Sequence, residues 1–399
     1  MPGGALAWWI GPVNGLLAPA TRRECRSPGP SFAVLEERAA RWTGERADPE
    51  DPEFAVGLRV LYESFLAVPE LSFTGLAGIR SEVSRHLRNR LRVRACLRAH
   101  PQITAAPVLR PVFVTGLPRT GTTALHALLA AMPGHRAPLM WELLDPCPPE
   151  GGEHRPDRRL RRAERMARLA RHMAPAYRVI HPVEARAPEE CVFALPHSMF
   201  HFIQARIPGY RDWYEARDAA PDYAYLRQQL QILQWRQPPR RWILKSPFHL
   251  WNLNALLREF PDATIVWTHR DPAAALASWC SLAEVSRRLY NRRVDLALLG
   301  RDWTQLWAEA TQRSARVRRI AARPFLDVRQ DELAAGPWPA LDPVLAGLGV
   351  ELDQAARQRI AGLGSGSAAP NAHRYGLERY SLTALAVRGA FPGLTAAAG

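Results

Sequence analysis

The chain has 399 residues, of which 47% are hydrophobic and 23% charged, which is ordinary for a soluble globular enzyme and enough to bury a large core. Its formal net charge of +15 and pI near 10.5 concentrate anions near the protein, whether nucleotides, nucleic acids or membrane surfaces. The sequence contains no run of about 18 apolar residues, so it predicts no membrane span.

The cysteines argue against a secreted, disulfide-stabilised protein. There are five of them, widely spaced and without a C-x-x-C pair, so neither a disulfide framework nor a zinc ribbon is indicated. The apolar start of the chain is interrupted by Gly, Pro and Asn and has no positive region before it, which is atypical of a signal peptide. We therefore expect a cytoplasmic location.

The N-terminal part divides into two segments. Residues 1–52 are rich in Pro, Gly and Arg, and we expect this segment to be loosely ordered. Residues 54–100 are predicted to be helical, because apolar residues recur at helical spacing on one face: Phe54, Leu58, Leu61 and Phe65.

The most informative motif follows at residues 111–123. An apolar run at 111–115 predicts a strand, a glycine-bounded loop comes next, and Gly116-x4-Gly121-Thr122-Thr123 has the spacing of a P-loop. An amphipathic helix then begins, with Leu125, Leu128, Leu129 and Met132 at helical spacing. Backbone N–H groups and a helix N-terminus in this arrangement bind phosphate-like groups.

One residue of this loop differs from a nucleotide triphosphatase. The Lys that should follow the second Gly is Thr122, and a cation stands earlier instead, at Arg119. The loop is therefore predicted to hold a phosphate-like group other than the β- and γ-phosphates of ATP.

The middle of the chain is predicted to be a helical insertion at about 158–236. Residues 145–157 have the composition of a loop, and residues 158–173 form a helix with seven Arg. That helix is either an anion- or membrane-binding face or, more simply, a solvated one.

The chain has 53 Lys and Arg residues, and Lys245 is its only Lys. It ends an apolar strand predicted at 241–245, in the position where α/β proteins bind ligands. Because a compact ammonium and a guanidinium are not interchangeable beside a small anion, we interpret Lys245 as a functional residue rather than a chance survivor of an Arg-rich composition.

Strands and helices alternate through the rest of the chain. A helix is predicted at 249–260, a buried strand at 263–268, helices at 272–290 and 301–322, and a last strand at 324–328. This alternation predicts a parallel sheet with helices on both faces.

A second anion site is predicted after the strand at 263–268. In His269-Arg270-Asp271-Pro272 the Asp is a good helix N-cap and the Pro a preferred first helical residue. Arg270 then lies at a strand end beside a helix N-terminus, with Ser278 two turns into that helix. A guanidinium and a hydroxyl so placed can hold a second phosphate.

Together these motifs resemble the sulfotransferases that use 3′-phosphoadenosine 5′-phosphosulfate. The resemblance is carried by Pro118-Arg119-Thr120-Gly121-Thr122-Thr123, by Leu244-Lys245-Ser246-Pro247, by Thr268-His269-Arg270-Asp271-Pro272 and by His373-Arg374 near the C-terminus. It is closest to a bacterial branch similar to protein-tyrosine sulfotransferases and covers about residues 54–392. It implies an α/β, P-loop-type three-layer domain over residues 53–392, with a central parallel sheet flanked by helices and a helical segment before it.

The resemblance also implies roles for individual residues. Cofactor binding falls to Arg119, Thr120, Gly121, Thr122, Thr123, Arg270 and Ser278, and catalysis to Arg119, Lys245 and a base, for which Glu142 stands near the family position. His249 and His126 are the alternative bases. The implied reaction is in-line sulfuryl transfer to a hydroxyl of a small-molecule acceptor, without a metal.

Other interpretations remain open from the sequence. His197-x3-His201 beside Glu189-Glu190 has metal-ligand spacing, but we place this segment at the acceptor pocket. A P-loop kinase and a basic nucleic-acid-binding protein are the rival functions, and an inactive scaffold of the same fold is a third. The identity of the acceptor and the oligomeric state cannot be predicted.

Overall fold

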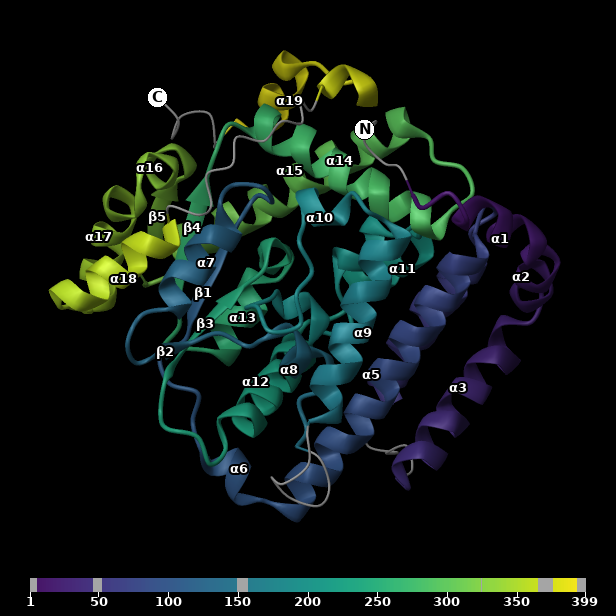
Figure 1. The fold of residues 1–399 in the computed structure, drawn as a ribbon, viewed down its shortest axis with the longest axis horizontal. Coiled ribbons are helices and arrows are strands. Elements are labelled where there is room, and N and C mark those ends of the chain that lie inside the picture. The colour runs from purple at the N-terminus through teal and green to yellow at the C-terminus, as the bar shows by residue number, and fades with distance from the viewer. Residues whose placement is uncertain (1–5, 46–51, 149–156, 324, 365–375, 393–399) are drawn as a thin grey trace.

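The computed structural model describes residues 6–45, 52–148, 157–323, 325–364 and 376–392. The predicted His373-Arg374 motif lies outside the described residues. At the centre is a five-stranded, all-parallel sheet in the order β2-β3-β1-β4-β5 (Figure 1). Its strands are β1 (Val112–Gly116), β2 (His135–Arg136), β3 (Arg241–Lys245), β4 (Thr264–His269) and β5 (Phe325–Arg329). The four predicted strands are confirmed, and among the described residues the two-residue edge strand β2 is the one strand that was not predicted.

Alternating side chains of the central strands build a core on each face of the sheet. On one face, Val112 and Val114 pack with α7 (Thr122–Ala130), α17 (Pro337–Leu348) and α18 (Gln354–Gly364). On the other, Phe113 joins a larger core with α12 (Ala220–Gln234), α13 (Leu253–Glu259), α14 (Pro272–Tyr290) and α15 (Leu296–Ile320). This arrangement confirms the predicted α/β class, with a parallel sheet between two helical layers.

The expectation of a loosely ordered segment at 1–52 is wrong for most of its described residues. They form α1 (Ile10–Leu16), α2 (Ala18–Cys25) and α3 (Pro28–Thr43), and α3 packs along α5 (Phe73–Ala99) (Figure 1). The prolines that suggested disorder stand in the first turns of α2 and α3, where a missing N–H costs nothing. Phe32, Leu35 and Ala39 are buried at helical spacing, which supplies the stabilisation.

The predicted helical stretch 54–100 is two helices, because Pro69 interrupts it. These are α4 (Pro52–Leu66) and α5. The short helix α6 (Gln102–Ala105) precedes the P-loop. The helices after the P-loop helix are α8 (Met140–Leu144), α9 (Arg158–Met173), α10 (Tyr177–Ile180) and α11 (Pro208–Ala216). Short 3-10 turns lie at Cys191–Phe193, Met199–Ile203 and Pro247–Trp251. The remaining elements are α16 (Gln330–Ala335), a 3-10 turn at Leu377–Tyr380 and α19 (Ala384–Ala390).

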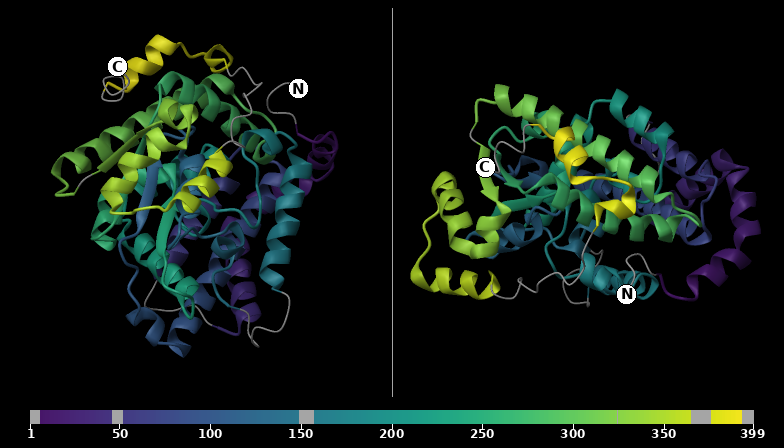
Figure 2. Two further views of the ribbon diagram at one scale, coloured as in Figure 1. Left: turned by 60° about the vertical axis from the view of Figure 1, so that its left-hand side comes forward. Right: turned by 90° about the horizontal axis from the view of Figure 1, so that it is seen from above.

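Helices α1–α3 and helices α16–α18 lie at opposite ends of the longest dimension of the molecule (Figures 1 and 2). The sheet therefore separates a smaller helical layer, formed by α7 and the C-terminal helices α17 and α18, from the larger helical layer. None of the helices among the described residues is long and apolar enough to cross a membrane. The domain boundaries at residues 52 and 392 stay predictions.

Candidate active site

The carboxyl ends of three adjacent strands bring the predicted motifs together. Strands β3, β1 and β4 are neighbours in the sheet. Strand β1 leads into the loop before α7, β3 ends at Lys245, and β4 leads to Arg270. Because these strands are parallel, all three motifs lie at the carboxyl ends of the strands, which is where open α/β sheets bind ligands.

The P-loop is built around backbone conformations that only glycine adopts easily. Gly116 has φ +139° and Gly121 φ +88°. The Thr120 hydroxyl donates to the Leu117 carbonyl at 2.6 Å and lies 2.5 Å from Thr268 Oγ1, which ties the loop to β4. The N–H groups of the first turn of α7 have no acceptor within their own helix, so they are available to an anion at this positive end of the helix dipole.

Arg119, Arg270 and Ser278 form one connected group. Arg119 Nε donates to Ser278 Oγ at 3.0 Å, and its Nη1 donates to the Ile180 carbonyl at 3.0 Å. Arg270 Nη1 donates to the Arg119 carbonyl at 2.9 Å. Burial lowers the pKa of Arg270 from its ordinary value, but a guanidinium stays charged at neutral pH. The loop cation Arg119 is therefore in direct contact with both residues of the predicted second anion site.

Lys245 is completely buried, and its ammonium lies between the P-loop helix and a pair of carboxylates. The Nζ atom is 2.8 Å from Glu190 Oε1, 3.4 Å from Thr123 Oγ1 and 3.8 Å from Glu189 Oε1. The Ser246 hydroxyl donates to Glu190 Oε2 at 3.4 Å. Since a buried ammonium is unfavourable without a counter-charge, Glu190 is its principal partner.

Glu189 is the more deeply engaged carboxylate of this pair. Burial acts to raise its pKa, but His181 and Lys245 outweigh burial and hold the pKa down, at about 2. Sequence reasoning assigned the two glutamates to the acceptor pocket and missed their contact with Lys245. The available signal was the chain's only Lys at a buried strand end, because such a cation requires a nearby carboxylate.

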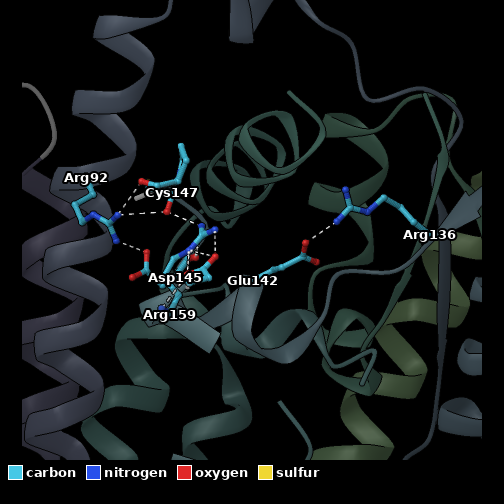
Figure 3. A network of polar contacts seen from close by, with 8 residues as sticks. Arg92, Arg136, Glu142, Asp145, Cys147 and Arg159 are labelled. Carbon is cyan, nitrogen blue, oxygen red and sulfur yellow. Dashed lines mark hydrogen bonds and ion pairs between the residues drawn. The ribbon is translucent and has the colours of Figure 1, made fainter. Parts of the chain in front are cut away.

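Glu142, the predicted base, is held by two other groups, one of which is the guanidinium of Arg136 (Figure 3). It is buried in α8, accepts a hydrogen bond from Arg136 Nη2 at 2.7 Å, and accepts another from the Leu139 N–H at 2.9 Å. The chain around it runs beside the glutamate pair, because the Glu189 N–H donates to the carbonyl of Pro138. Glu142 therefore lies on a segment that adjoins the site, but its described bonds lead to Arg136.

The two alternative bases are buried and neutral. Burial, with a contribution from Lys245, lowers the pKa of His126 to about 3, and His126 Nε2 lies 3.0 Å from the Ile243 carbonyl. Burial lowers the pKa of His249 to about 3, and its Nδ1 is bonded to the Tyr223 hydroxyl at 3.0 Å. Neither of these two histidine rings forms a described hydrogen bond with the ammonium of Lys245.

The two histidines at metal-ligand spacing make separate hydrogen bonds. His197 Nδ1 pairs with Asp222 at 2.8 Å, and His201 Nε2 lies 3.3 Å from the Pro196 carbonyl. Within the described part of the chain, no group of three His, Cys, Asp or Glu residues is arranged to hold a metal ion.

An open cavity of about 620 Å³ lies beside α9. It is lined by α9, Arg178 of α10 and residues 182–186, and several of its side chains are arginines: Arg168, Arg171, Arg178 and Arg186. Between Arg178 and residue 182 lie Ile180, which contacts Arg119, and His181, which pairs with Glu189 at 3.5 Å. The cavity has the volume of a small-molecule site.

Comparisons with known proteins agree with this geometry. Residues 111–354 match the model of the sulfotransferase family. Among solved structures, the chain is similar to sulfotransferase STF1 from Mycobacterium tuberculosis H37Rv, with 30% identity, a TM-score of 0.78, and coverage of 91% of this chain and 98% of that one. It is also similar to sulfotransferase STF9 from Mycobacterium avium, with 27% identity, a TM-score of 0.80, and coverage of 90% and 94%. No curated protein matches significantly. Because the family match spans more than half of the chain, this protein is a member of the sulfotransferase family and an enzyme of sulfuryl transfer.

Proposed function

We propose that the enzyme transfers a sulfuryl group from 3′-phosphoadenosine 5′-phosphosulfate to a hydroxyl of a small-molecule acceptor. The observation that carries the proposal is the contact between Arg119 of the P-loop and Ser278, with Arg270 bonded to the same loop. This donor has anionic groups at both its 5′ and 3′ positions. Two adjoining sets of cationic and hydroxyl groups at one sheet edge fit both of them.

The residues present suit this donor better than they suit ATP. The glycine-dependent loop and the first turn of α7 offer backbone N–H groups for the 5′ group, and Arg270 and Ser278 offer side-chain donors for the 3′-phosphate. Thr122 follows Gly121 where a kinase has its phosphate-binding Lys. The rival kinase function therefore lacks its principal cation.

Lys245 and Arg119 are the groups that we propose for catalysis at the donor. When bound, the donor supplies an activated sulfuryl group and a phosphate leaving group. Fixed cations beside that leaving group stabilise the negative charge that develops on it during in-line transfer. A sulfuryl group carries less charge than a phosphoryl group, so the proposed reaction includes no metal.

A base must accept the proton of the acceptor hydroxyl, and Glu142 is the base implied by the family position. Its two oxygens are engaged by Arg136 and by the Leu139 N–H, so it stays a prediction that requires a direct test. The cavity beside α9 is the proposed acceptor entrance, because Ile180 and His181 connect its wall to Arg119 and Glu189. The five cysteines are all free thiols, which supports the proposed cytoplasmic location.

Calorimetric titration with 3′-phosphoadenosine 5′-phosphate, beside ATP with Mg²⁺, tests this function. We expect binding of the 3′-phosphorylated nucleotide that persists in EDTA and weakens at least about tenfold in Arg270→Ala, the range for removal of a charged hydrogen bond. Arg258→Ala is the matched control, because Arg258 forms an exposed ion pair with Asp218. Preference for Mg-ATP, or equal binding by both variants, would contradict the proposal.

A further inference from the structure

We propose that Glu190, rather than Glu142, accepts the proton of the acceptor hydroxyl, and that in the empty enzyme Lys245 neutralises this base. The inference rests on the proposed function and adds a catalytic residue to it. Glu190 follows Glu189 on the segment that reaches the end of β3, and its carboxylate is the closest described acidic group to the Lys245 ammonium.

The first argument is the position of the ammonium. Lys245 Nζ contacts Thr123 of the P-loop helix at 3.4 Å and Glu190 at 2.8 Å. The same ammonium therefore adjoins both the predicted donor-binding loop and the carboxylate. A group that bonds to the ammonium from the side of the loop competes with Glu190 for its three N–H donors.

The second argument compares Glu190 with its neighbour. The Glu189 side chain is 6% exposed, pairs with His181 at 3.5 Å and accepts a hydrogen bond from the Glu190 N–H at 2.9 Å. The Glu190 side chain is 15% exposed, and among the described residues its second oxygen has only the long 3.4 Å contact with Ser246. Glu190 is thus the more accessible of the two carboxylates and has an oxygen that a hydroxyl can approach.

The third argument is the fixed position of Glu142. Arg136 binds it at 2.7 Å (Figure 3). The same guanidinium also donates to the Leu233 carbonyl at 3.1 Å and lies 4.3 Å from the centre of the Trp242 ring. Both carboxylate oxygens of Glu142 already accept a hydrogen bond, one from Arg136 and one from the Leu139 N–H. Glu142 has the bonds of a residue that anchors α8.

These contacts define a sequence of events at Glu190. When an anionic donor attracts Lys245, the ion pair to Glu190 weakens and the carboxylate becomes available. The acceptor O–H bond then breaks with its proton passing to Glu190, the acceptor oxygen bonds to sulfur, and the bond from sulfur to the leaving phosphate breaks with its electron pair staying on that phosphate. The base is thus exposed only when the donor is present, which disfavours acceptor activation in the empty enzyme.

Nucleotide affinity provides a test that needs no acceptor. Glu190→Gln removes a negative charge beside the proposed donor site and leaves Lys245 with only the more distant Glu189 carboxylate among the described residues, so we expect 3′-phosphoadenosine 5′-phosphate to bind about tenfold more tightly by calorimetry. The matched control is Glu309→Gln, which removes a partner 2.7 Å from Arg211 on α11 and α15. It should leave the affinity unchanged.

Hydrolysis of the donor, with water as the acceptor, provides the second readout. In Glu190→Gln we expect the rate to fall at least about 100-fold and to lose its decline toward acid pH, the loss typical of a removed general base. Glu190→Asp keeps the carboxylate and should recover part of both properties. A larger loss in Glu142→Gln than in Glu190→Gln would overturn the assignment.

The outcomes separate this inference from the proposed function. If the native enzyme fails to bind the 3′-phosphorylated nucleotide, the proposed function fails. If it binds, but Glu190→Gln shows either unchanged affinity or unchanged hydrolysis, the function stands and the role of Glu190 is refuted. Thermal unfolding of each variant checks that it is folded, and Glu190→Ala, which also removes the carboxylate, replaces Glu190→Gln in both measurements if Glu190→Gln does not fold.

Discussion

Replacing Gly116 by Ala should destabilise the enzyme by an amount that the structure allows us to estimate. A Cβ at Gly116 would lie 2.5 Å from the carbonyl oxygen and 2.6 Å from the Oγ1 of Thr268, and the φ of +139° is already unfavourable for an L side chain. The conformation costs about 1–2 kcal/mol and the overpacking about 1–3 kcal/mol. We therefore expect a loss of about 2–5 kcal/mol in the free energy of unfolding.

Gly134→Ala separates the two contributions. Gly134 also has a positive φ, +74°, but a Cβ there would meet nothing within 4 Å. Any stabilisation through the unfolded chain is common to both substitutions and cancels in the comparison. Urea unfolding should show Gly116→Ala to be the less stable by about 1–3 kcal/mol. Equal stabilities of the two variants would refute the argument that contact with Thr268 selects glycine at this position.

Three further results are expected. Lys245→Ala and Arg119→Ala should each lower single-turnover release of the 3′-phosphorylated nucleotide at least about 100-fold, because each removes a fixed cation from the leaving group; a loss below tenfold in both would contradict that role. Glu142→Gln should leave nucleotide affinity unchanged by calorimetry and lower unfolding stability by about 1–3 kcal/mol, since it weakens the bond to Arg136. For Glu284, burial acts to raise the carboxyl pKa, but hydrogen bonds from Arg379 and Tyr380 outweigh it, and the folded pKa is lowered. Its stabilisation is therefore complete above the unfolded pKa of about 4.3 and is lost as pH falls through the folded value. The stability difference between the native enzyme and Glu284→Gln should shrink between pH 7 and pH 3, and a constant difference would show that the charge is not responsible.

Local patterns predicted the central sheet well because its strands are short, apolar and bounded by clear turns. The run before Gly116 and the run ending at Lys245 are buried on both faces, so every residue in them is selected for burial. Strand β2 has two residues, too few to show any period. The N-terminal helices were missed because the prediction used the content of Pro and Gly and not their positions. Pro28 stands at the first position of a helix, where proline is favourable.

The site could be predicted as far as it depends on single motifs. The P-loop, Lys245 and Arg270 come from three separate stretches, and the parallel order of their strands places all three at one edge. The partner of Lys245 depends on a segment without regular structure, which approaches β3 only through long-range packing. The sequence around Glu190 and Glu142 does not show which of them lies beside Lys245, because that contact joins segments far apart in the chain.

The contacts of Arg119 can couple the binding of one ligand to the binding of another. Its guanidinium bonds to Ser278 of the proposed nucleotide site on one side and to the Ile180 carbonyl on the other, and Ile180 lies two residues before Pro182 of the arginine-lined cavity. A ligand that draws Arg119 toward itself necessarily changes the support of Ile180. Any cooperativity transmitted in this way is reciprocal, so an acceptor whose affinity rises fivefold with nucleotide bound must raise nucleotide affinity by the same factor, about 1 kcal/mol.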